Sequence, residues 1–376
     1  MAQEKYLPPI ARIAEDCVNC GICVQECAFL EEKGSPKHLA EEWLAGRGGG
    51  FPFECNLCGL CRGVCPDDLD PSAMILAMRR ELVARGEGDL RQHRTLRAYE
   101  KRGTSSLFSW FYLPENCKTI FFPGCALPGS RPHVFTSLFQ LLQELLPDLG
   151  LVFDCCTNPS HDLGNEAHFK KTFGELCDIL LRHSVQKVLV ACPSCYRLFE
   201  EHGAGLRVGM IYEELGQAGR IFRQERRQVT VHDPCGVRFS GKVQDSVREI
   251  LRQSGLEVRE MAHSRATSFC CGEGGAAGFL RPDFSRVWTD KRVAEASAMQ
   301  VVSYCAGCTS SRDRRAGSAH LLELLLNPES ALEGGAKVSK APFTYWNRYR
   351  LKKRLQRQLQ GGVCGSRQEL SGKKVS

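Results

Sequence analysis

The sequence has no long hydrophobic run. None of its uninterrupted apolar stretches approaches the roughly 18 residues that a membrane-spanning helix needs. The first ten residues also have no basic start, no apolar core and no twin arginine, so they do not resemble a secretion signal. We therefore expect a cytoplasmic protein, either free or bound peripherally at the inner face of the cytoplasmic membrane.

Two recognition features are missing as well. No Gly-x-Gly-x-x-Gly follows a predicted strand, so we do not expect the chain itself to bind flavin or nicotinamide. No helix-turn-helix pattern is present, and the net charge of +7 belongs to one segment. Residues 336–376 hold eleven Lys/Arg and one acidic residue, which leaves −3 for the other 335 residues. A slightly acidic body argues against a nucleic acid as partner.

Cysteine, by contrast, is abundant, with 21 in 376 residues. Eighteen of them fall into four sets with repeating spacings. Two compact sets read C-x2-C-x2-C-x3-C, namely Cys17, Cys20, Cys23, Cys27 and Cys55, Cys58, Cys61, Cys65. Two spread sets hold a single cysteine, an adjacent pair and a CxxC, namely Cys125, Cys155, Cys156, Cys192, Cys195 and Cys235, Cys270, Cys271, Cys305, Cys308. In a cytoplasmic chain of this length, such sets favour metal or redox chemistry over a disulfide scaffold.

The compact sets are typical of bacterial ferredoxins that hold two [4Fe–4S] clusters, in which the fourth cysteine of each run binds the other cluster. We therefore assign Cys17, Cys20, Cys23 and Cys65 to one cubane cluster. Cys55, Cys58, Cys61 and Cys27 take the other. A pair of zinc sites is the alternative, but zinc sites usually consist of separate CxxC pairs.

Beyond these runs the pattern becomes α/β. Expected strands at 119–122, 151–153 and 187–191 alternate with helices at 134–146 and 166–183. The order repeats about 113 residues later, with strands at 229–232, 256–261 and 300–304 and helices at 242–254 and 284–299. This indicates a duplicated unit with a mostly parallel sheet, in which cysteines from several strand ends meet at one edge.

We thus divide the chain into a mostly helical dicluster domain, a connector, two cysteine-rich α/β domains and a basic tail. Their expected bounds are 1–88, 89–116, 117–227, 228–326 and 327–376. Helices are expected at 39–45 and 71–85, and the connector is expected to lie on the surface and to dock Leu107, Phe108, Trp110 and Phe111.

The spread sets resemble the paired cysteine-rich CCG modules of heterodisulfide reductases. Similar modules occur in the iron–sulfur subunits of anaerobic glycerol-3-phosphate dehydrogenase, glycolate oxidase and lactate-utilisation complexes. The resemblance covers about residues 10–325 and implies that each five-cysteine set holds a noncubane [4Fe–4S] cluster. The second pair keeps its glycine, Cys270-Cys271-Gly272, whereas the first reads Cys155-Cys156-Thr157. Some relatives keep zinc or nothing in a module, so zinc is the alternative in the first one.

Two further residues are candidates beside the second set. His232 follows a predicted strand within Val-His-Asp-Pro-Cys and is our candidate catalytic residue, because imidazole can give a proton to a leaving thiolate. Hydrogen bonding within the fold is the more ordinary role for such a histidine. Gly272 is expected to let the backbone approach a cluster closely. Cys117, Cys177 and Cys364 fall outside the sets, and Cys177 is expected in the core.

The basic tail contains a helical pattern at 343–359 in which Leu351, Leu355 and Leu359 share a face. Such a segment can lie on an anionic membrane, dock on an acidic partner or simply be solvated. For function, we expect an electron-transfer subunit whose partners are a flavoprotein or other electron donor and, as a further subunit, a quinone-reactive membrane protein. A catalytic disulfide reductase is the alternative, and a redox-sensing protein a third.

Overall fold

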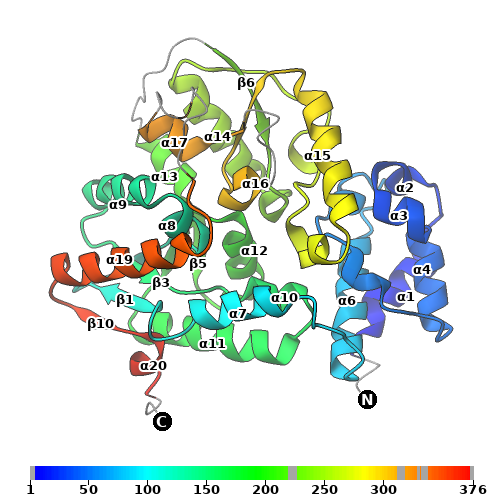
Figure 1. Cartoon of the computed structure of the whole chain (residues 1–376), viewed down its shortest axis with the longest axis horizontal. Coiled ribbons are helices and arrows are strands. Elements are labelled where there is room, and N and C mark those ends of the chain that lie inside the picture. The colour runs from blue at the N-terminus through cyan, green and yellow to red at the C-terminus, as the bar shows by residue number, and fades with distance from the viewer. Residues whose placement is uncertain (1–4, 219–226, 311–317, 328–330, 332–337, 373–376) are drawn as a thin grey trace.

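Short helices separated by cysteine-bearing loops make up the N-terminal part of the chain. The computed structural model describes residues 5–218, 227–310, 318–327, 331 and 338–372 (Figure 1). The helical elements of this first part are α1 (Leu7–Asp16), α2 (Ile22–Glu26), α3 (Ala28–Lys33), α4 (Pro36–Leu44), the 3-10 turn η1 (Phe51–Glu54), α5 (Leu60–Gly63) and α6 (Pro71–Ala84).

Local sequence chemistry sets where the longer of these helices begin. Ser35 caps α4 and Asp70 caps α6, because each side chain accepts a hydrogen bond from a backbone N–H in the first turn. A proline follows each cap, where its missing N–H costs nothing. The helices expected at 39–45 and 71–85 are both confirmed, and α4 begins three residues earlier than expected.

The first α/β unit is built on a mixed sheet with the strand order β10-β1-β3-β2-β4-β5. Its strands are β1 (Trp110–Leu113), β2 (Thr119–Phe122), β3 (Gly150–Phe153), β4 (Lys187–Val190), β5 (Arg207–Met210) and β10 (Val363–Gly365). The four strands from β3 to β5 are parallel, whereas β1 pairs antiparallel with both β3 and β10.

The second unit repeats the parallel part of this sheet with the order β7-β6-β8-β9. Its strands are β6 (Gln228–His232), β7 (Glu257–Val258), β8 (Gln300–Ser303) and β9 (Ala319–His320). Each strand occupies the place of its counterpart in β3-β2-β4-β5, and all pairs are parallel. The predicted duplicated, mostly parallel architecture is therefore confirmed, although β7 is shorter than the strand expected at 256–261.

Helices pack around both sheets (Figure 1). The first unit has α8 (Ala126–Ser130), α9 (Pro132–Leu145), α10 (Asn158–Asp162), α11 (Glu166–Arg182), α12 (Pro193–His202) and α13 (Ile211–Gln217). The second has the 3-10 turns η2 (Cys235–Val237), η3 (Arg265–Thr267) and η4 (Gly274–Phe279), with α14 (Gly241–Gln253), α15 (Pro282–Ala296), α16 (Ala306–Ser310) and α17 (Leu321–Leu326). The four helices expected in the α/β region correspond to α9, α11, α14 and α15.

The expected connector is more ordered than its composition indicates. It contains α7 (Arg94–Gly103) and contributes β1 to the first sheet. Phe108, Trp110 and Phe111 are buried as expected, but Leu107 is 52% exposed. The prediction for Leu107 is wrong because this residue lies in the turn at 106–108 before β1, where its side chain faces solvent.

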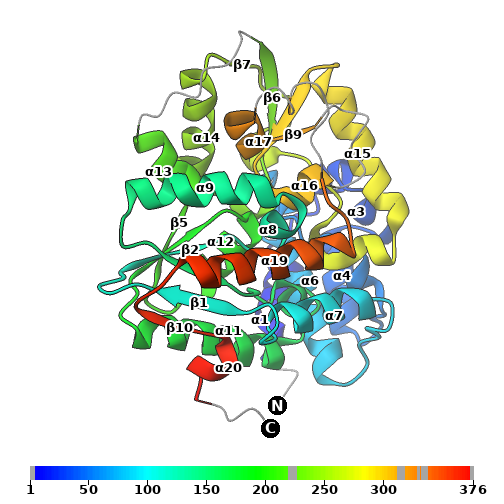
Figure 2. The ribbon, with the colours of Figure 1, turned by 60° about the vertical axis from the view of Figure 1, so that its left-hand side comes forward.

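The segment expected as a basic tail completes the first unit. Helix α19 (Phe343–Gln358) packs on α8 and α9, β10 extends the sheet, and α20 (Arg367–Leu370) contacts α11 (Figure 2). Leu351 and Leu355 are each only 5% exposed because they face the protein. The described part of this segment, residues 338–372, is therefore not a solvated tail, and its leucine face is not available to a membrane. Lys337, Lys373 and Lys374 lie outside the described residues.

One buried arginine on α6 joins the three parts of the chain. The Arg79 guanidinium is fully buried and donates hydrogen bonds to the carbonyl oxygens of Pro52 at 2.9 Å, Asp162 at 2.6 Å and Gly275 at 2.8 Å. These acceptors belong to the helical part, the first α/β unit and the second α/β unit, respectively. Arg79 thereby fixes the cysteine loops of the different parts relative to one another.

Among the described residues, no helix combines the length and the apolar character needed to cross a lipid bilayer.

Candidate metal centres

The first compact set gathers around the loop that connects α1 with α2. This loop turns sharply because Asn19 and Gly21 adopt left-handed backbone conformations, with φ of 57° and 81°. Burial raises the pKa of Cys23 to about 11, and the neighbouring Cys17, Cys20 and Cys65 add to the rise. The same four cysteines line one hollow in the surface. Cys65 comes from the other compact motif, and Cys61 of that motif also lines the hollow.

The second compact set shows the reciprocal exchange. Burial raises the pKa of Cys27 to about 12, and its nearest charged neighbours are Cys58 and Cys55. Burial also holds the pKa of Cys61 well above its usual value, with Cys58, Cys55 and Cys27 as further causes. Cys27 therefore lies with the second motif and not with its own.

These compact sets suit soft metal ions. All 21 cysteines are free of disulfide bonds. The eight cysteines of the compact sets therefore offer thiol sulfur atoms as metal ligands. Buried thiols that raise one another's pKa become thiolates readily only when a cation shares the site. The donor chemistry thus fits iron–sulfur clusters, which would be held by Cys17, Cys20, Cys23, Cys65 and by Cys27, Cys55, Cys58, Cys61.

The first spread set assembles at the carboxyl ends of β2, β3 and β4. Cys125 begins α8, Cys155 and Cys156 follow β3, and Cys192 caps α12. The Cys195 thiol donates to the Cys156 sulfur at 3.3 Å. Cys192 lies beside Cys195, and this proximity lowers the pKa of Cys192 to about 7. A second contact joins Cys125 and Cys155, so the five sulfurs form one group at the edge of the sheet.

The second spread set lies at the matching edge of the second sheet. Hydrogen bonds from the Cys270 and Cys308 thiols lower the pKa of Cys271. Cys308 also lies beside Cys305, and burial together with the nearby Cys271 raises the pKa of Cys235 to about 12. As in the first unit, cysteines that are far apart in sequence meet where parallel strands end.

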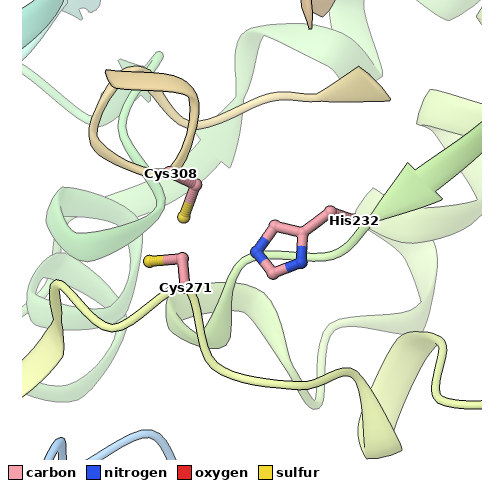
Figure 3. A group of neighbouring side chains, drawn as sticks. All are labelled: His232, Cys271 and Cys308. Carbon is pink, nitrogen blue, oxygen red and sulfur yellow. The ribbon is translucent and has the colours of Figure 1, made fainter. Parts of the chain in front are cut away.

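His232 belongs to this second group. Its ring points toward the sulfurs of Cys271 and Cys308 (Figure 3), and the donor atoms of the three residues lie within 4.8 Å of one another. Burial lowers the pKa of His232, and the nearby Arg292 lowers it further. A neutral imidazole at this place can donate a hydrogen bond to a sulfur or itself act as a ligand.

The residue after each cysteine pair has the same backbone conformation in the two units. Gly272 has a φ of 85°, and its carbonyl accepts hydrogen bonds from Asn56 at 3.1 Å and Ser285 at 3.0 Å. Thr157 also lies in the left-handed region, with a φ of 55°. Thr157 therefore preserves the turn that glycine makes in the second unit. The left-handed conformation is strained for a β-branched residue.

A contact that sequence spacing does not reveal connects the second compact set with the second spread set. Cys58 packs against the buried cluster that contains Cys270, and its proximity to the Cys270 thiol lowers the pKa of Cys58 to about 6. Arg238 follows the loop of the second spread set and donates to the Cys58 carbonyl at 2.8 Å. Cys58 therefore stands between the two cysteine sets.

The two spread sets are neighbours as well. Burial raises the pKa of the fully buried Tyr212, and Cys305 of one set and Cys192 of the other add to the rise. Close packing continues at Gly236, where a Cβ atom would come within 2.5 Å of the Pro193 carbonyl oxygen. The four sets thus follow one another through the molecule, from the first compact set to the first spread set.

An ion pair that the sequence patterns do not reveal braces the first spread set. Arg367 of α20 forms a two-pronged pair with Asp154, through bonds of 3.0 Å from Nε and 2.7 Å from Nη2. Asp154 in turn accepts the Cys155 N–H at 2.6 Å and the Ser109 hydroxyl at 2.9 Å. The aspartate directly precedes the cysteine pair, but its partner is more than 200 positions away and has no sequence signal.

The three remaining cysteines lie apart from these groups. Cys177 is buried on α11, which confirms that it is a core residue. Cys117 is buried just before β2, where its thiol donates to the Thr119 carbonyl at 3.3 Å. Cys364 is exposed on β10.

Comparison with known protein families agrees with this organisation. The 4Fe-4S dicluster domain family matches residues 16–70. The family described as cysteine-rich domain, CCG, matches twice, at residues 119–200 and 229–311. The matched regions contain both compact sets and both spread sets.

Several curated proteins are similar along much of the chain. EtfAB:quinone oxidoreductase of Syntrophomonas wolfei is 24% identical over 269 residues, which cover 61% of this chain and 37% of that protein. One subunit of the fumarate reductase (CoM/CoB) of Methanothermobacter marburgensis is 25% identical, with 78% and 66% covered. One subunit of the dihydromethanophenazine:CoB–CoM heterodisulfide reductase of Methanosarcina barkeri is 23% identical, with 74% and 83% covered. The chain spans less than two thirds of the length of the first two relatives.

Proposed function

Because the chain belongs to the heterodisulfide reductase-related iron–sulfur proteins, in which a dicluster ferredoxin domain precedes two CCG domains, we propose that it is an electron-transfer subunit. In this role it passes electrons between a partner dehydrogenase or other donor and an acceptor. Bound iron–sulfur clusters would supply one-electron storage at each of the four cysteine sets. We assign cubane clusters to the compact sets and noncubane clusters to the spread sets, with zinc as the alternative in the first spread set.

The observation that carries this proposal is the packing of Cys58 against the buried cluster that contains Cys270. It joins the second compact set to the second spread set without intervening protein. The second spread set in turn packs against the first, because Gly236, next to Cys235, lies directly against Pro193, next to Cys192. A linear series of neighbouring redox centres suits one-electron relay better than four separate structural metal sites would.

The first compact set, at the opposite end of this series, is accessible for electron exchange with a partner. Cys20 is exposed, and the adjacent Val18 and Ile22 are 71% and 42% exposed. Apolar side chains around an accessible cluster ligand suit a transient contact with a redox partner. The relatives whose names mention quinone and heterodisulfide reductase support partners of two kinds, a flavoprotein or other donor and a quinone-reactive subunit.

Anaerobic purification from the native host tests this proposal. Four clusters of four iron atoms predict about sixteen iron atoms and about sixteen sulfides per chain, whereas about eight would leave the spread sets without clusters. The protein should co-purify with a redox partner that reduces it when the partner's substrate is added. An iron-free protein, or an iron-containing one that no co-purified partner can reduce or oxidise, would refute the relay.

A second candidate function is supported by a cavity beside Cys271. The cavity encloses about 320 Å³ and is also lined by Gly272, Phe279 and Ser285. A disulfide R–S–S–R′ placed there could take two electrons from the reduced protein and two protons, and leave as RSH and R′SH. His232 lies beside Cys271, so its neutral imidazole could donate a hydrogen bond to a product thiolate while the two protons come from solvent.

Thiol release distinguishes the two functions. The reduced protein is mixed with a mixed disulfide and, in a parallel sample, with an oxidised dye. A disulfide reductase releases two thiols per two electrons consumed, and His232→Gln slows this release without slowing dye reduction. A protein that reduces the dye and releases no thiol is a relay only.

A further inference from the structure

A buried cation from the C-terminal helix reaches the first spread set. Arg348 lies on the inner face of α19 and is only 6% exposed. Its guanidinium lies over the rings of Phe108 and Tyr99, at 5.1 Å and 5.9 Å from their centroids. Among the residues that the structure describes, its buried Nη1 atom has no hydrogen-bond partner. A buried guanidinium without a carboxylate to bond is costly unless another negative group is near.

Arg348 lies close to the cysteines of the first spread set. Cys125 heads the charges that raise the pKa of Arg348 against the opposing effect of burial, and Cys155 also contributes. The separation is small at Gly103: a methyl group placed there would lie 3.6 Å from the Cys155 sulfur and 3.8 Å from Arg348 Nη2. The gap between the guanidinium and the thiol is therefore no wider than the space that a methyl group on Gly103 would fill.

We propose that Arg348 is a positioning residue for the first spread set, where it supplies the positive charge that offsets the metal–thiolate centre held by the five cysteines. The inference rests on the proposed function only in requiring that these cysteines hold a metal. Its effect on a redox centre follows from electrostatics: each added electron makes the centre more negative, and a nearby buried cation stabilises that form. Arg348 therefore raises the midpoint potential of the first centre.

The two spread sets differ in this respect. At the second set, His232 faces Cys271 and Cys308, and the buried Arg292 lies near His232. Arg238 lies on the side of Cys58 and Cys235, where it is shared with the second compact set. The cations near the second set thus come from its own unit, whereas Arg348 is delivered to the first set by a segment outside the duplicated units.

A packing role for Arg348 is the competing explanation, because its guanidinium covers two aromatic rings. Three variants separate packing from charge. Arg348→Met keeps an unbranched side chain and removes the charge, whereas Arg348→Lys keeps the charge. Lys352→Met is the matched control, because Lys352 lies one turn away on the same helix, is also buried and donates to the carbonyls of Leu107 at 3.2 Å and Ser109 at 2.9 Å.

The experiment is an anaerobic redox titration of the full chain followed by electron paramagnetic resonance. The signal of the first centre is identified as the one lost in Cys156→Ser. In Arg348→Met, the ratio of reduced to oxidised first centre at a fixed potential should fall about tenfold, which is a shift of about 59 mV for one electron. Arg348→Lys should recover most of this ratio, and Lys352→Met should leave it unchanged.

Metal retention gives a readout that does not depend on the kind of metal. We expect a chelator to remove metal from the first set several-fold faster in Arg348→Met than in Arg348→Lys or Lys352→Met. Unchanged midpoint and unchanged metal retention in Arg348→Met would overturn the inference, as would equal losses in Lys352→Met. Absence of a wild-type signal that depends on Cys156 would instead contradict the iron–sulfur assignment, while the chelator measurement still decides the role of Arg348.

Discussion

Removing the Arg367 side chain should loosen the C-terminal segment strongly. Arg367 and Asp154 are 3% and 1% exposed, and their ion pair has two hydrogen bonds. Arg367→Met leaves the Asp154 carboxylate buried with only the Ser109 hydroxyl and the Cys155 N–H as donors. Breaking a buried pair by removing one partner costs about 3–5 kcal/mol. At about 1.4 kcal/mol per factor of ten, the opening equilibrium should increase by at least about 100-fold.

Hydrogen exchange measured by mass spectrometry can test this value locally. The probes are the amides that pair β10 with β1, in the register of Phe111 with Gly365. The matched control is Arg354→Met on α19, because that exposed side chain donates one bond of 2.7 Å to the Thr136 hydroxyl. A change at such an exposed site should cost below about 1 kcal/mol.

A second variant separates the lost pair from lost packing. Asp154→Asn combined with Arg367→Met removes the unpaired charge, so it should recover a large part of the protection lost in Arg367→Met. If Arg367→Met exchanged at nearly the wild-type rate, or if the double variant recovered nothing, the assigned role of the ion pair would be wrong.

Three further predictions concern single positions. Thr157→Gly should raise the urea midpoint, because relief of left-handed strain contributes about 1–2 kcal/mol; an unchanged or lower midpoint contradicts the strain. Crossed ligation predicts that Cys27→Ser removes the same paramagnetic signal as Cys58→Ser and a different one from Cys17→Ser. Burial and His161 lower the pKa of His202 to about 4. In the unfolded chain this histidine has a pKa near 6.5, so below about pH 6.5 the unfolded state binds more protons than the folded state and stability should fall. His202→Gln should flatten that dependence in urea melts between pH 8 and 5.5.

The strands and helices of the duplicated units could be predicted because their signals are local. Strands β2, β4, β6 and β8 are short apolar runs that end just before a cysteine, and α9 and α11 have a clear helical period. Strand β1 was missed because its aromatic residues resemble a docking loop, and its partner β10 reads Val-Cys-Gly with exposed side chains. Pairing of such an edge strand depends on the rest of the sheet and not on its own sequence.

The cysteine groups were predictable for a similar reason. Spacing within each motif restricts which thiols can meet, and parallel strands bring their carboxyl ends to a single edge. The contact of Cys58 with Cys270 and the approach of Arg348 to Cys155 were not predictable. Both depend on how separate parts pack, and the arginine belongs to a segment whose composition resembles a solvated tail.

The return of the C-terminal segment to the first sheet also sets an order for biosynthesis. Phe111 of β1 pairs with Gly365 of β10, which is synthesised 254 residues later, after the whole second unit. A ribosome-bound chain can therefore finish the dicluster part and the second unit while the first unit still has an open sheet edge. The first five-cysteine centre becomes enclosed last, so delivery of its metal can wait until translation is nearly over.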